Sequence, residues 1–133
     1  MNLKLVFRIF GGLNILTGAF ALFATKAMLG SAGLTVTSEL ITVGQGFAIT
    51  AIVLGLVSWR TADIAGDSLY AYGQLFGIVQ ALQILLIVYH LITGQAGGPP
   101  VYINLVVGIV LAALFYFYSQ QDDNSVIISD DEE

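Results

Sequence analysis

The feature that most constrains this chain is a stretch of 54 residues, from Ser68 to Gln121, that contains no Asp, Glu, Lys or Arg. Because a soluble domain carries roughly 25% charged residues, so long an uncharged stretch cannot be a soluble core. It is also too long for one membrane crossing, since about 20 residues span a bilayer. Glycines and two adjacent prolines interrupt it at residues 93–100, where a helix must end. The stretch therefore predicts a hairpin of two transmembrane helices.

Two more uncharged segments, residues 9–25 and 40–59, precede this hairpin and bring the number of predicted membrane spans to four. We expect the spans at about residues 3–25, 40–59, 69–92 and 101–118. Short connections favour antiparallel neighbours, so residues 1–121 are predicted to form one all-α domain, an up-down-up-down bundle of four transmembrane helices. Residues 27–37 and 61–67 are the expected loop and tight turn. The acidic segment 122–133 is predicted to be a disordered tail.

The ends of two spans carry further signals. Thr37 or Ser38 is the expected N-cap of the second span. The first span also fits a cleaved signal peptide, with Ala19 and Ala21 in an A-x-A arrangement, but we expect it to be retained as a helix.

The composition excludes several classes of protein. Hydrophobic residues make up 57% of the chain, charged residues 10%, and the mean hydropathy is +0.89, as in polytopic membrane proteins. The four basic residues form no patch, so nucleic acid is not an expected partner. Cysteine is absent, which rules out disulfides, thiolate catalysis and Cys-based metal sites. No nucleophile–base pair, two-His metal spacing or phosphate-binding loop is found, so we expect neither an enzyme nor a metal site.

The basic residues predict an orientation in the membrane. Lys4, Arg8 and Arg60 fall on one side of the expected bundle and Lys26 on the other. By the positive-inside rule both termini face the cytoplasm. The expected location is a bacterial or archaeal inner or plasma membrane.

Small residues recur at helical spacing in every span, which predicts close helix packing, because lipid offers no hydrophobic force between helices. The predicted seams are Gly11, Asn14 and Gly18; Gly44, Ala48, Ala51 and Gly55; Gly66, Gly73 and Gly77; and Asn104, Gly108 and Ala112.

Polar side chains near the middle of the spans are the candidate functional residues. An amide at bilayer depth must find a partner or lose several kcal/mol, so one interpretation is a structural hydrogen-bonded layer. The expected members of this layer are Asn14, Thr50, Gln80, Gln83 and Asn104. The alternative is a pocket for a quinone headgroup, a pigment or a substrate on the helix face that carries Gln80, Gln83 and His90.

His90 and Glu39 form a separate polar group toward the non-cytoplasmic side. Imidazole can ligate haem or chlorophyll, but one His cannot supply both axial ligands, and His90 lies near the end of its span. We therefore expect a neutral His90 bonded to Glu39 or Asn104, and no cofactor is assigned. Glu39, in the first turn of a helix, is favoured there by the helix dipole.

Several short sequences in the first half of the chain carry a resemblance to a known group. They are Gly44-Gln45-Gly46-Phe47, Leu54-Gly55-Leu56 and Trp59-Arg60, together with Lys4, Arg8 and Gly11-Gly12. Over about the first 60 residues the chain resembles the small DoxX-like four-helix membrane proteins. The resemblance implies four helices, and some members of that group are accessory subunits of quinone-linked oxidoreductases.

Nearly every residue is thus assigned to helix, seam or interface, which favours a structural role. We expect a non-enzymatic accessory subunit of a larger membrane complex, of the quinone-linked, respiratory or photosynthetic kind. Its partners would be lipid and other membrane subunits or copies of itself. One alternative is a homo-oligomeric small transporter or channel. Small multidrug transporters resemble the chain in size, but the carboxylate that they need within the first span is missing here. The other alternative is a quinone- or pigment-binding subunit.

Overall fold

The computed structural model describes residues 1–120, so the predicted acidic tail lies outside the described residues. Within them the structure is helical, with no strand. The elements are α1 (Leu3–Phe23), α2 (Thr25–Ser31), α3 (Ser38–Ile64), the 3-10 turn η1 (Gly66–Ser68), α4 (Leu69–Thr93) and α5 (Pro99–Ser119).

Four of these helices, α1, α3, α4 and α5, are long and apolar enough to cross a membrane, which confirms the prediction of an all-α protein with four candidate spans. Their outward faces carry large apolar side chains that water would not tolerate in such number. Leu16, Phe47 and Leu85, for example, are each 65% or more exposed. These surfaces indicate an integral membrane protein.

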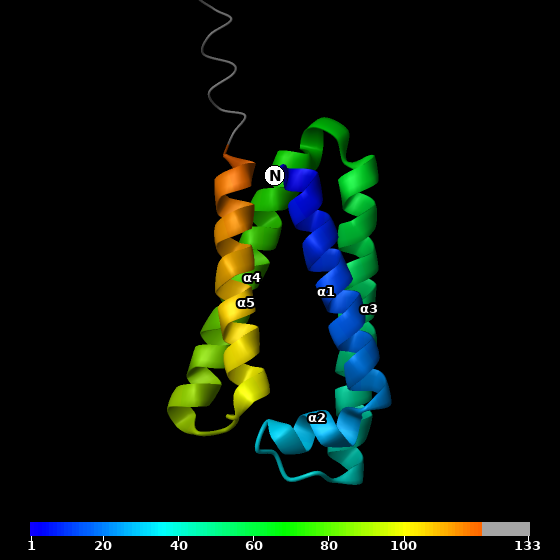
Figure 1. The fold of residues 1–133 in the computed structure, drawn as a ribbon, viewed down its shortest axis with the longest axis vertical. Helices are drawn as coiled ribbons and strands as arrows, with labels where there is room; N and C mark the ends of the chain where they lie inside the picture. Colours follow the sequence, from blue (N-terminus) through cyan, green and yellow to red (C-terminus); the bar gives the residue numbers. More distant parts are fainter. Residues whose placement is uncertain (121–133) are drawn as a thin grey trace, which may run out of the picture.

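The helices are arranged as two pairs, α1 with α3 and α4 with α5 (Figure 1). The pairs lie close together at the end that holds the N-terminus and the last turn of α5, and they diverge toward the opposite end. The short helix α2 lies across that opposite end (Figure 1). We call the end where the pairs lie close together the joined end, and we call helix α2 at the opposite end the floor.

Small residues hold the first pair together. A Cβ atom added to Gly11 would lie 2.7 Å from the carbonyl oxygen of Gly55, and one added to Gly18 would lie 2.7 Å from that of Ala48. The two backbones touch at both levels, so the predicted seam is confirmed at these positions. The Ser58 hydroxyl, fully buried, adds an interhelical hydrogen bond of 2.8 Å to the carbonyl oxygen of Phe7.

A cluster of four phenylalanines joins the two pairs. Phe7 and Phe10 of α1 pack against Phe76 of α4 and Phe115 of α5, with ring centroids 5.0–5.7 Å apart and mostly edge-to-face. Such aromatic pairs add about 0.5–1.5 kcal/mol each beyond their buried area. This phenylalanine cluster lies at the joined end, where it forms the centre of the hydrophobic core.

Hydrogen bonds connect the floor, helix α2, to both helix pairs. The Thr25 hydroxyl donates to the carbonyl oxygen of Ala21 at 2.6 Å, which holds α2 against the end of α1. At the other end of α2, the carbonyl oxygen of Ala32 accepts a 3.0 Å hydrogen bond from the N–H of Gly97, in the α4–α5 connection. Gly98 has φ +84°, and a Cβ there would collide with the Ser31 carbonyl oxygen, so only glycine fits.

Two connections differ from the sequence-based expectation. The segment 61–67 was predicted to be a turn, but α3 continues to Ile64 because Ala62 is buried in the core and Asp63 forms a 3.0 Å ion pair with Arg8. Gly66 lies in the shortened turn with φ +53° and touches no neighbouring helix, so its assignment to a packing seam was wrong. The predicted loop 27–37 contains most of α2.

Three of the remaining helix ends lie at or close to the residues where the sequence predicts them. Thr37 is the N-cap of α3, and its Oγ1 accepts a 3.2 Å hydrogen bond from the N–H of Leu40. Gly94, with φ +69°, ends α4 in a left-handed conformation. Pro99 and Pro100 occupy the first turn of α5, where a missing N–H has no consequence, so this helix begins two residues earlier than expected.

Candidate functional site

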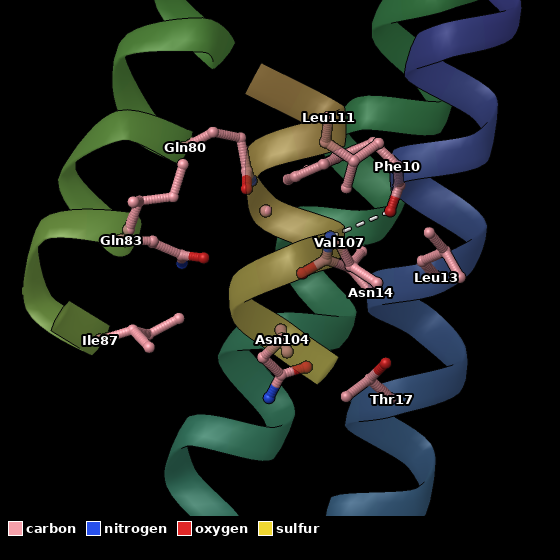
Figure 2. A pocket seen from close by; sticks show the side chains of 13 residues that line it. Phe10, Leu13, Asn14, Thr17, Gln80, Gln83, Ile87, Asn104, Val107 and Leu111 are labelled. Atoms are coloured by element: carbon pink, nitrogen blue, oxygen red, sulfur yellow. Dashed lines mark hydrogen bonds between the residues drawn. The ribbon is translucent and has the colours of Figure 1, made fainter. Parts of the chain in front are cut away.

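A cavity of about 230 Å³ lies between the two helix pairs, below the phenylalanine cluster. All four long helices contribute to its walls, and Phe10 and Leu111 of the core line it as well. Its polar side chains are Asn14, Thr17, Gln80, Gln83 and Asn104. We call this space the carboxamide cavity, because four of those five side chains end in an amide (Figure 2).

Gln80 is the most buried member, with only 4% of its surface exposed. Its amide reaches across toward α5, where Oε1 lies 3.7 Å from the position that a Cβ on Gly108 would take (Figure 2). It makes no hydrogen bond to any side chain or backbone group of residues 1–120. No fully enclosed polar side-chain atom in that range lacks a partner, so the amide of Gln80 faces the free space of the cavity.

The other amides complete the lining from three helices. Asn14 of α1 is half-buried, and its Nδ2 donates a 2.9 Å hydrogen bond to the carbonyl oxygen of Phe10, one turn earlier. This bond fixes the side chain against its own helix and leaves Oδ1 directed to the cavity. Gln83 of α4 and Asn104 of α5 extend toward the same space (Figure 2).

The lining combines polar and apolar side chains and carries no ionisable one. A carboxamide offers two N–H donors and a carbonyl acceptor with no net charge. The cavity can therefore bind groups that accept or donate hydrogen bonds, such as carbonyls, hydroxyls or water. It is unsuited to ions, because a buried charge needs an opposite charge or several kcal/mol of compensation.

The structure brings together four of the five residues predicted for the polar layer: Asn14, Gln80, Gln83 and Asn104. No hydrogen bond within residues 1–120 joins one of these amides to another. Thr50 lies elsewhere, on an exposed face of α3, and its hydroxyl donates a 3.0 Å hydrogen bond to the Gly46 carbonyl oxygen. Depth along the helix was predictable for Thr50, but the face on which it lies was not.

Thr17 lines the carboxamide cavity although it was not among the sequence candidates. It follows Asn14 by three residues, so the two share a face of α1. That spacing could have identified it.

His90 and Glu39 do not line the carboxamide cavity. The His90 ring is half-buried beside Tyr89, with ring centroids 5.9 Å apart. Among the described residues it forms no hydrogen bond or ion pair with Glu39 or Asn104. Glu39 is exposed in the first turn of α3.

No group of three or more His, Cys, Asp or Glu side chains within residues 1–120 could hold a metal ion. Comparisons with protein-family models, curated proteins and solved structures find no match for this chain. The resemblance to DoxX-like proteins therefore stays a prediction.

Proposed function

We propose that this chain is a membrane-embedded accessory subunit that holds a small uncharged molecule in the carboxamide cavity and does not itself catalyse a reaction. The observation that carries the proposal is Gln80, a residue with only 4% of its surface exposed, whose amide is unpaired with any described residue and faces a space lined by three more amides. A purely structural layer would pair these groups across helices, since an unmet amide in lipid loses several kcal/mol.

A quinone headgroup fits the chemistry of this lining. Its two carbonyl oxygens accept hydrogen bonds, and each carboxamide nitrogen can donate two. Its ring is flat and uncharged, and the apolar side chains of Phe10 and Leu111 in the cavity lining can pack against it. The proposed role is to position or store such a molecule for a partner subunit that performs the redox chemistry.

The proposed topology has the four helices crossing a bacterial or archaeal inner or plasma membrane in alternating directions, with both termini in the cytoplasm. Lys4, Arg8 and Arg60 support this orientation, because they lie toward the joined end while Lys26 lies on the floor. A reporter fused after the last residue should be active in the cytoplasm only, as should one inserted at Gly66. Activity of both on the outside would contradict the orientation.

Binding can be tested with a tail-less dimethoxy-methyl-benzoquinone as the probe, added to the full chain in nanodiscs. Saturation-transfer NMR should show saturable binding to the wild type. Gln80→Leu should weaken it about tenfold, because one hydrogen bond to a buried ligand group contributes on the order of 1 kcal/mol or more. Thr50→Val is the matched control and should bind as the wild type does, since Thr50 faces away from the cavity. Equal binding by wild type and Gln80→Leu would refute the proposed site.

The accessory role has its own test. After solubilisation of the source membrane in mild detergent, the chain should migrate with larger membrane proteins. A chain that migrates alone as a small homo-oligomer would contradict this role and favour a transporter or channel.

A further inference from the structure

A second cavity, of about 340 Å³, adjoins the carboxamide cavity on the side of the floor. The two share Thr17 of α1 and Ala51 of α3 in their linings. The second cavity lies between α1, α2 and α3 and is partly open at the surface. It is lined by small, aliphatic and aromatic side chains, among them Gly18, Ala21, Met28, Leu29, Phe47 and Ala48. We call it the apolar cavity.

Helix α2 is amphipathic and presents its apolar face to this cavity. Thr25, Met28, Leu29 and Ala32 line the space and follow the i, i+3, i+4, i+7 spacing of one helix face. Lys26 and Ala27 are exposed on the other side. A helix at the end of a membrane bundle would ordinarily bury its apolar face in lipid. Here that face is turned toward the partly open space between α1 and α3, and Met28 and Leu29 are half-buried there.

The position of α2 is fixed by packing against α3. A Cβ on Gly44 would lie 3.1 Å from Cγ2 of Thr25 and 3.6 Å from Cδ1 of Leu29, so the two helices are in direct contact there. Together with the hydrogen bond between Ala32 and Gly97, this contact keeps the floor under both cavities. The apolar cavity is therefore bounded on the side of α2 by a helix whose position the fold fixes.

We propose, building on the function proposed above, that the two cavities form one site for a lipid with an uncharged headgroup. The headgroup lies among the amides around Gln80, and the hydrocarbon tail passes Thr17 and Ala51 into the apolar cavity above α2. Water can be held only in the carboxamide cavity, because the apolar cavity offers it no polar partners. A hydrocarbon chain fits only the apolar cavity, because in the carboxamide cavity it would leave the amides unpaired.

The side chains that line the two cavities limit the class of lipid that can bind there. No ionisable side chain lines either cavity, so a phosphate or ammonium headgroup would be buried without a counter-charge. Lipids whose headgroups carry only carbonyl or hydroxyl groups, such as prenylated quinones or diacylglycerols, meet both requirements.

The position of the tail can be mapped by photo-crosslinking. The probe is the benzoquinone ring used above with a decyl tail that ends in a diazirine, bound to the full chain in nanodiscs and irradiated. Peptide mass spectrometry should place the adducts within residues 17–32 and 44–51, and an excess of the unlabelled decyl quinone should suppress them.

A pair of variants tests the same inference. Ala21→Phe fills the apolar cavity and should reduce these adducts at least fivefold, whereas Ala113→Phe, on an exposed face of α5, should not change them. The wild-type adduct map remains decisive if Ala21→Phe fails to fold.

The outcomes separate the two proposals. Adducts spread over the exposed faces of α4 and α5, while the tail-less quinone still binds in a Gln80-dependent manner, would overturn the proposed tail position alone. Loss of the Gln80 dependence for the tail-less quinone would overturn the proposed function, and the two-compartment site with it.

Discussion

Replacing Gly55 by alanine should destabilise the protein through the backbone contact between α1 and α3. The new Cβ would lie 2.7 Å from the carbonyl oxygen of Gly11, 2.8 Å from Cγ1 of Ile15 and 2.9 Å from the Ile15 nitrogen. Two of these atoms belong to the backbone and cannot rotate away, so the helices must separate. Overpacking of this kind costs about 1–3 kcal/mol. We expect Gly55→Ala to fall at the upper end of that range.

The same helix supplies the control. A Cβ at Gly46 meets no atom within 4 Å, so Gly46→Ala changes only the intrinsic helix propensity, which favours alanine by up to about 1 kcal/mol. Gly46→Ala should therefore be neutral or stabilising. The two substitutions make the same chemical change in α3 and differ only in their neighbours.

Unfolding in mixed micelles of mild detergent and dodecyl sulfate provides the assay. Trp59 is a suitable fluorescent reporter, because its backbone nitrogen lies 3.1 Å and its Cβ 3.4 Å from a Cβ placed at Gly11. The reasoning is refuted if Gly55→Ala unfolds at the same dodecyl sulfate fraction as Gly46→Ala. That result would mean that the two helices are not held in backbone contact.

Three further substitutions have defined outcomes. Ser58→Ala removes the 2.8 Å hydrogen bond to the Phe7 carbonyl oxygen and should cost about 0.6–1.7 kcal/mol in the same unfolding assay. Asp63→Asn breaks the 3.0 Å ion pair with Arg8, but both side chains are partly exposed, so the loss should stay below about 1 kcal/mol and disappear at high salt. His90→Gln should be tolerated within about 1 kcal/mol and leave the visible absorption spectrum of the purified protein unchanged, whereas loss of an absorption band would show that His90 ligates a cofactor.

The number and type of the long helices could be predicted because they depend on a local property. A run of about 20 uncharged residues must cross lipid as a helix, whatever the rest of the chain does. The N-cap at Thr37 and the breaks at Gly94 and Pro99 are equally local, since each depends on the conformation of one or two residues. These features required no knowledge of neighbouring helices.

Features that depend on contacts between helices were harder to predict. The polar sequence at residues 61–64 looks like a turn, but its helical form is stabilised by the burial of Ala62 and the pairing of Asp63 with Arg8. Helix α2 is only seven residues long and would be marginal alone, so its existence depends on its contact with α3. Neither interaction can be read from the local sequence.

The candidate site could be predicted from the sequence only in part. Four of the residues predicted from their depth in the membrane, Asn14, Gln80, Gln83 and Asn104, line the carboxamide cavity, but no hydrogen bond within residues 1–120 joins one of their amides to another. The same argument from membrane depth also predicted Thr50, which lies on an outward face of α3. A threonine satisfies its one hydroxyl proton by bonding to the carbonyl oxygen one turn earlier in its own helix, whereas a carboxamide bonded in this way, as Asn14 is to Phe10, still has a second N–H and a carbonyl oxygen to pair. Of the residues predicted for the polar layer, the four amides line the carboxamide cavity and Thr50 does not.

The carboxamide cavity exists because the two helix pairs are held by different means at their two ends. At the joined end four large aromatic rings from α1, α4 and α5 fill the space between the pairs. At the other end α2 and its hydrogen bond to Gly97 bridge the pairs without filling that space. Between these two ends, no hydrogen bond within residues 1–120 joins one amide of the cavity to another. This arrangement supports the proposal made above that a ligand with hydrogen-bonding groups of its own occupies the carboxamide cavity.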